Sequence, residues 1–167
     1  MPTINSVRII NAEFNNGRGI YDNFILDPEG NSFVYELANG GGKTVLLLLM
    51  LQCVYPNSKL EDNKPFKLMF EGGDKNRTTH AMIEWKLDKG IHSYGYAVTG
   101  VCAKKKTAYD GSEKDELDYF NYVIFYNHSN EYDICKIPLC KNYEDGSLES
   151  VFSYSDTHSM LKNLKKN

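Results

Sequence analysis

The sequence predicts an α/β domain with a mixed α+β layout, in which a phosphate-binding loop precedes an antiparallel β-meander. Three observations predict this class. A glycine-rich segment lies directly between a strand-like stretch and an apolar, helix-like stretch. Several strand-like stretches then follow one another with little helical sequence between them. Aromatic residues, which favour strands, make up 13% of the chain.

The 167 residues fit a single domain, residues 1–167, that is long enough to bury a core. The net charge of -3 makes the chain a poor general binder of nucleic acid. The first residues lack the basic and apolar regions of a signal peptide, and no apolar run approaches the roughly 20 residues that span a membrane. We therefore expect a cytoplasmic protein without a membrane partner. The scattered cysteines and histidines predict no metal cluster.

The first part of the chain alternates strand and turn residues. Asn5–Phe14 contains β-branched residues and predicts a strand, and Asn15–Asn23 has the composition of a turn. Phe24–Leu37 predicts two strands joined at the turn formers Asp27–Gly30. The second of these strands, Ser32–Leu37, leads straight into the glycines.

A helix is predicted next, over Thr44–Tyr55. Its residues are mostly Leu and Met, which favour helices, and Pro56 ends it. Because it is apolar all round, we expect burial on every face. An irregular connection, Glu61–His80, follows.

The rest of the chain predicts a meander. Lys104–Asp118 is expected to be a charged loop, and residues 155–167 the start of a further helix. The four expected strands are Ala81–Leu87, Ser93–Ala103, Tyr119–Asn127 and Tyr132–Leu139.

The glycine segment matches most of the phosphate-loop pattern GxxxxGK[ST]. Gly42, Lys43 and Thr44 fit its second half, whereas Leu37 replaces its first glycine. Lys43 is expected to reach the β- and γ-phosphates and the Thr44 hydroxyl to bind Mg²⁺, with the helix N-terminus adding partial positive charge. The alternative is a tight turn that binds nothing. The predicted nucleotide-binding residues, whose amides would surround the anion, are Asn39, Gly40, Gly41, Gly42, Lys43 and Thr44.

The acid that hydrolysis would require is missing from the pattern. A phosphate-loop ATPase needs an acidic residue after an apolar strand, but Tyr122–Asn127 ends in Asn. Glu84 alternates with Trp85 and Leu87 and is expected on the solvent face of its strand. Phe70–Asp74 lacks the serine of an ABC-type signature. We therefore expect no catalytic residue within this chain.

The order of these parts resembles the N-terminal half of an SMC-type ATPase head, most closely in MukB-like and Wadjet-type bacterial proteins. The resemblance rests on the strand Ser6–Phe14, an arginine-containing turn, the Asn39–Thr44 loop, an apolar helix and a meander. Tyr154–Leu164 is also similar to the MukB-like segment that precedes the coiled coil. The resemblance implies a P-loop NTPase half-domain of the ABC/SMC head type, the N-terminal (Walker A) lobe, with residues 155–167 leading toward a coiled coil.

The resemblance also implies cofactors and partners. ATP and Mg²⁺ would bind here, and a C-terminal lobe, of the same or a partner polypeptide, would supply the signature motif, the Mg²⁺-binding Asp and the catalytic Glu. Two heads would form a head-to-head homodimer around ATP and act on DNA at the nucleoid, with kleisin-like subunits, in chromosome organisation or segregation, repair, or defence against plasmids and phage. Arg18 matches a family arginine near the phosphates. Leu37 departs from the family pattern, and the family's Q-loop glutamine has no counterpart in Glu61–His80, since Gln52 comes too early.

Two lysine clusters are candidate DNA contacts, although surface charge runs are more often simply solvated. They are Lys104, Lys105 and Lys106, and Lys162, Lys165 and Lys166.

Two other classes of function stay open. One is a self-contained small P-loop kinase or GTPase, which would need parallel βα units. The other is a non-catalytic interaction domain.

Overall fold

The structure of the chain is a computed structural model. It describes residues 1–14, 18–56, 78–88, 90–91, 93–107, 113–127, 133–134, 139–142, 144, 148–150, 155–157 and 159.

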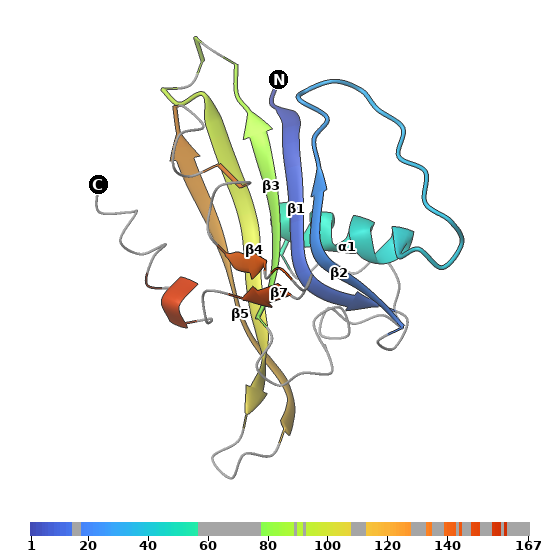
Figure 1. Cartoon of the computed structure of the whole chain (residues 1–167). Coiled ribbons are helices and arrows are strands. Elements are labelled where there is room, and N and C mark those ends of the chain that lie inside the picture. Colours follow the sequence, from blue (N-terminus) through green and yellow to red (C-terminus); the bar gives the residue numbers. More distant parts are fainter. Residues whose placement is uncertain are drawn as a thin grey trace.

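A five-stranded antiparallel sheet forms the centre of the molecule (Figure 1). Its strand order is β2-β1-β3-β4-β5, and every neighbouring pair is antiparallel. The expected meander is therefore present as β3, β4 and β5. The strands are β1 (Thr3–Phe14), β2 (Gly19–Leu26), β3 (Thr78–Lys86), β4 (Tyr96–Thr107) and β5 (Glu113–Tyr126).

The predicted α/β class, a P-loop NTPase half-domain with its glycine loop leaving a sheet strand, is wrong. Within the described residues no two strands are parallel, and one helix, α1 (Lys43–Val54), packs on the sheet. An α/β fold needs parallel strands joined by crossover helices, whereas β3, β4 and β5 follow one another as antiparallel neighbours. The chain is therefore a mainly antiparallel β-fold with a helix on one face.

The segment predicted as the strand Ser32–Leu37 is not a strand. It belongs to a long loop that leaves the end of β2, swings away from the sheet and returns to α1 (Figure 1). Val34 is 97% exposed, whereas Leu37 packs against the core and the ring of Tyr35 lies edge-on to Phe24, with 5.7 Å between the ring centroids. An alternating sequence becomes a strand only where a partner strand supplies hydrogen bonds, and no described strand pairs with this segment.

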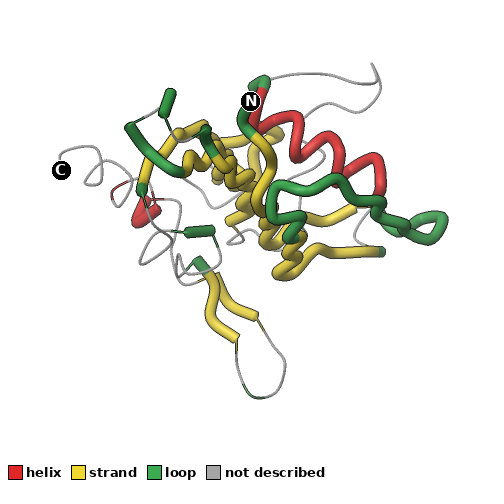
Figure 2. Tube along the Cα trace, turned by 90° about the horizontal axis from the view of Figure 1, so that it is seen from above, coloured by secondary structure: helices red, strands yellow, loops and turns green. Residues whose placement is uncertain are grey.

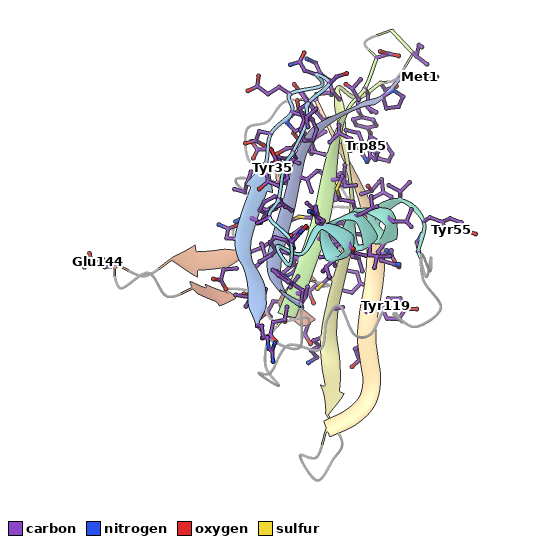
Figure 3. All side chains as sticks on the ribbon, turned by 90° about the vertical axis from the view of Figure 1, so that its right-hand side faces the viewer. Met1, Tyr35, Tyr55, Trp85, Tyr119 and Glu144 are labelled. Carbon is purple, nitrogen blue, oxygen red and sulfur yellow. The ribbon has the colours of Figure 1, made fainter. Side chains whose placement is uncertain are left out.

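Helix α1 forms where it was predicted, but it is not buried on every face. It lies across one face of the sheet, from the β2 side toward β5, with Tyr55 just beyond its end (Figure 3). Leu48 and Leu49 pack against Val7 and Ile83 of the sheet, whereas Leu47 is 57% exposed. The prediction from the all-apolar sequence that α1 is buried on every face is therefore wrong, because only one side of the helix packs on the sheet.

The opposite face of the sheet is also covered, and it buries charged groups. Residues on the C-terminal side, including Ile134, pack against it. Arg8 donates a hydrogen bond from Nη1 to the Ile134 carbonyl oxygen at 2.6 Å and one from Nε to Asn23 Oδ1 at 2.9 Å. The expectation that Glu84 faces solvent is wrong, because its carboxylate is buried and accepts hydrogen bonds from Asn5 and Tyr126.

Strands β4 and β5 extend into the two ends of the stretch expected to be a charged loop, up to Thr107 and from Glu113 on, and residues 108–112 lie outside the described part. Lys104 pairs with Asp118, and Thr107 with Glu113, so the two strands form a long hairpin that projects beyond the other strands (Figure 1). Opposite charges directly across a strand pair favour this extension.

The C-terminal part of the chain is described only in pieces. The strand predicted for Tyr132–Leu139 is not seen at its described residues 133, 134 and 139, and its other residues lie outside the described part. Instead, β6 (Cys140–Asn142) and β7 (Leu148–Ser150) form a second, two-stranded sheet. Residues 155–157 and 159 are helical, and the rest of the helix predicted for 155–167 lies outside the described residues.

His80 is expected to make the stability of this fold sensitive to acid. It is fully buried, and among the described residues neither ring nitrogen has a hydrogen-bond partner. Burial, and then the charge of Arg8, lowers the pKa of His80 from 6.5 to about 3. In the unfolded chain the imidazole takes up its proton near pH 6.5, so the free energy of unfolding should fall progressively as the pH drops from about 6.5 toward 3.

The test is denaturant unfolding of wild type and His80→Leu between pH 8 and pH 4. Carboxylates titrate in both proteins, so the difference between the two pH profiles isolates His80. We expect the wild type to lose more stability than the variant below about pH 6.5, at up to about 1.4 kcal/mol per pH unit. Parallel profiles would contradict a neutral, buried His80.

Candidate functional site

The glycine segment sits between the long loop and α1, against the edge of the sheet. Gly42 is the residue immediately before the first residue of α1. A Cβ atom at Gly42 would lie 2.7 Å from the Tyr21 hydroxyl oxygen and 3.1 Å from the tip of the Phe14 ring. The segment therefore lies directly against Phe14 of β1 and Tyr21 of β2.

Two glycines in the segment have left-handed backbone conformations. The φ angles are 81° at Gly40 and 82° at Gly42, values that side chains other than glycine seldom tolerate. Between them the Gly41 amide donates to the Ala38 carbonyl oxygen at 3.0 Å, which closes a tight turn. The first helical bond follows at once, from the Leu46 amide to the Gly42 carbonyl oxygen at 2.8 Å.

These conformations leave the N-terminus of α1 uncapped. No side chain caps it, its first turn holds no acidic residue, and within the described part of the chain no group accepts a hydrogen bond from the amides of Gly42, Lys43 or Thr44. Such amides, together with the helix dipole, favour an anion. The expected ring of amides is thus only partly present, because the Gly41 amide is already bound to Ala38.

Lys43 and Thr44 lie on the exposed first turn of α1. The Lys43 ammonium donates to the Leu37 carbonyl oxygen at 2.8 Å, so in this structure it is turned back toward the loop. Beside it is an open pocket of about 460 Å³, which lies on the N-terminal side of the glycines. Its lining residues are Val34, Tyr35, Glu36, Leu37, Ala38, Asn39 and Lys43.

The turn that carries Arg18 lies at the same end of the sheet. Gly19 backs onto the Phe14 ring, with 2.3 Å between its hypothetical Cβ and the nearest ring carbon, and the tip of that ring approaches Gly42. Arg18 itself is exposed. The turn that carries Arg18 therefore lies close to the glycine segment.

Tyr21 is a residue of the site that the sequence interpretation missed. Its hydroxyl donates to the Gly41 carbonyl oxygen at 3.0 Å, and its ring packs between Phe14, at 4.9 Å, and Phe24, at 5.1 Å. Burial, with a smaller contribution from Tyr35, raises the pKa of Tyr21, so the hydroxyl stays protonated as a donor. No sequence pattern marks it, since an aromatic residue in a strand ordinarily indicates only core.

The other candidate residues do not join the site. Glu84 is buried on the sheet face opposite α1, so it cannot reach Thr44. Lys104 lies on the projecting β4–β5 hairpin, away from α1 (Figures 1 and 2), and Lys105 and Lys106 follow it in β4. The side chains of Lys105 and Lys106, and all of Lys162, Lys165 and Lys166, lie outside the described part.

Two further searches concern only the described residues. They contain no group of three or more His, Cys, Asp or Glu side chains placed to hold a metal ion. None of their helices is both long and apolar enough to cross a membrane. Comparisons with protein-family models, curated proteins and solved structures found no match to this chain.

Proposed function

We propose that this chain binds the polyphosphate of Mg²⁺-ATP at the N-terminus of α1, as one lobe of a divided ATPase. One observation carries the proposal: two left-handed glycines lead into an uncapped helix whose first residues are Lys43 and Thr44. The helix end and its unpartnered amides favour a phosphate. Lys43 needs only to exchange the Leu37 carbonyl oxygen for a phosphate oxygen, a stronger, charge-assisted partner. Thr44 would hold Mg²⁺, and Arg18 would approach from the neighbouring turn.

The proposed lobe binds the nucleotide but does not complete its hydrolysis. Glu84, the one strand acid weighed for this role, is buried on the far face of the sheet and bound by Asn5 and Tyr126. A second lobe would therefore supply the catalytic acid and the remaining Mg²⁺ ligand. This division is the one that the resemblance to SMC-like ATPases implies, and the proposal does not depend on the α/β topology that the sheet rules out.

The wider role that we propose follows from that resemblance. The lobe would join a C-terminal lobe of the same or a partner polypeptide, pair head to head around ATP, with accessory kleisin-like subunits, and act on DNA at the nucleoid in chromosome organisation, repair or defence. The projecting hairpin that carries Lys104, Lys105 and Lys106 is the proposed DNA contact. Asp118, opposite Lys104, offsets part of that charge, so this contact would be weak and salt-sensitive.

The self-contained kinase or GTPase is the weaker alternative. Such enzymes build parallel βα units around the phosphate loop, whereas the described sheet is antiparallel and Ser32–Leu37 is not part of it. The non-catalytic interaction domain is the remaining competitor, and only binding experiments separate it from a nucleotide-binding lobe.

Replacing Lys43 tests the proposed phosphate site. Titration of Mg²⁺-ATP and of tripolyphosphate into the chain, followed by ³¹P NMR at millimolar concentrations, should detect binding by wild type. Lys43→Ala should weaken it by about tenfold or more, because a charge-assisted hydrogen bond is lost. Lys86→Ala, which removes an exposed lysine at the end of β3, is the matched control and should bind like wild type.

Three outcomes would contradict the proposal in different ways. Equal affinity of wild type and Lys43→Ala would remove the phosphate site. Robust ATP turnover by the chain alone, abolished in Lys43→Ala, would instead show that no second lobe is needed. If a complex with the C-terminal lobe also gave no nucleotide response, the non-catalytic interaction domain would be the better description.

A further inference from the structure

The hydroxyl of Tyr21 contacts the backbone of Gly41 and occupies the space beside Gly42. It donates to the Gly41 carbonyl oxygen at 3.0 Å, and its oxygen lies 2.7 Å from the position that a Cβ of Gly42 would occupy. Gly41 and Gly42 share one peptide group, which consists of the Gly41 carbonyl and the Gly42 amide. Tyr21 therefore contacts that peptide group from the side of the core.

Because the peptide group is planar and trans, the direction of the Gly41 carbonyl oxygen fixes the direction of the Gly42 amide hydrogen. In a planar trans peptide the carbonyl oxygen and the amide hydrogen point in opposite directions. Because the Gly41 oxygen faces inward to Tyr21, the Gly42 amide hydrogen faces outward, away from the core. This amide has no acceptor in the described part of the chain and lies at the open end of α1.

The side chain that makes this contact is itself fixed. Tyr21 lies opposite Ala12 in the β1–β2 ladder, and its ring is buried between Phe14 and Phe24. The sheet thus positions the hydroxyl before any ligand arrives. The peptide already has its outward orientation before a ligand binds, so binding carries no free-energy cost for ordering this peptide.

We propose that Tyr21 is a positioning residue that aims the Gly42 amide at the phosphate. This inference rests on the proposed function and deepens it, since it assigns to one core side chain the orientation of one ligand-binding amide. Tyr21 does not touch the anion and acts only through the Gly41–Gly42 peptide. Without the hydroxyl, this peptide can rotate, and the amide is presented to the phosphate only part of the time.

Tyr21→Phe is the direct test, because it keeps the aromatic packing and removes only the hydroxyl. Binding of tripolyphosphate and Mg²⁺-ATP is measured by titration of ¹⁵N-glycine-labelled protein, with the Gly42 amide resonance as the readout. We expect affinity about three- to tenfold weaker than wild type, the effect of one lost neutral hydrogen bond, and a smaller shift of the Gly42 resonance at saturation.

Tyr126→Phe is the matched control. It also removes a hydrogen-bonded tyrosine hydroxyl, here the donor to Glu84 on the opposite sheet face. Its stability should fall, but the affinity and the Gly42 shift of the folded protein should equal those of wild type. The comparison therefore shows whether a general loss of stability is enough to change the affinity and the Gly42 shift.

Wild-type protein without ligand gives a test that needs no variant. The outward Gly42 amide should exchange its hydrogen with solvent rapidly, whereas the Gly41 amide, bound to the Ala38 oxygen, should be protected. Slow exchange at Gly42, or equal affinity of wild type and Tyr21→Phe, would overturn the assignment while leaving the phosphate site in place. Failure of wild type itself to bind either ligand would overturn the proposed function, and this assignment with it.

Discussion

Leu49→Ala is expected to lower the free energy of unfolding by about 2–5 kcal/mol, the usual cost of emptying a well-packed leucine site. Leu49 is 0% exposed and belongs to the cluster that joins α1 to the sheet. The surrounding β-branched residues, such as Val7 and Ile83, are fixed in paired strands and can close the cavity only partly. Urea unfolding followed by fluorescence of Trp85, the sole tryptophan, reports on this cluster directly.

Leu47→Ala is the matched control for this prediction. It removes the same atoms from the same helix, but at a side chain that is 57% exposed. Alanine favours helices, so we expect a change within about 0.5 kcal/mol. Equal losses at the two positions would mean that the outer face of α1 is covered in solution, and the one-sided packing of the helix would then be wrong.

Gly42→Ala is expected to cost about 2–5 kcal/mol and to abolish polyphosphate binding. Two effects add. A φ of 82° is strained by about 1–2 kcal/mol for any residue with a Cβ. The new methyl group would also collide with the Tyr21 hydroxyl, 2.7 Å away, and adapting to it costs about a further 1–3 kcal/mol. The peptide that presents the Gly42 amide must shift to relieve the contact.

Gly40→Ala separates the two effects. Gly40 has nearly the same φ, 81°, but a Cβ there would meet nothing within 4 Å. Only the backbone strain applies, so we expect a loss of about 1–2 kcal/mol. Thermal or urea unfolding of both variants, with tripolyphosphate titration of each, makes the comparison. Equal losses would show that Tyr21 and Phe14 are free to move away from Gly42.

The elements that could be predicted are those whose own residues determine their secondary structure. The helix was expected over Thr44–Tyr55 and forms over Lys43–Val54. The first strand and three of the four predicted meander strands also form, although β4 and β5 are longer than expected and no strand is seen at the described residues of Tyr132–Leu139. Run length, β-branching and the glycines before the helix are local properties, and a segment keeps them whatever it packs against.

Two of the predictions that failed depended on the partners of a segment, which its own sequence does not specify. Ser32–Leu37 has the composition of a strand, yet no described strand pairs with it. Alternation along β3 correctly placed Glu84 and Trp85 on different faces, but it could not say that both faces are covered, so Glu84 was expected in solvent.

In the candidate site, too, some features could be predicted from the sequence and others were found only in the structure. Residues 39–44 could be proposed in advance as a phosphate loop, since such a loop needs glycines and a following helix in one continuous stretch, and their binding of a nucleotide stays a prediction. The role of Tyr21, the use of the Gly41 amide by Ala38 and the nearness of the Arg18 turn appeared only in three dimensions. Local conformational preference decides which short segments can become a helix or a glycine turn. Strand pairing, the burial of each face and the direction of each amide depend on residues far apart in the chain, whose contacts form only when the sheet assembles.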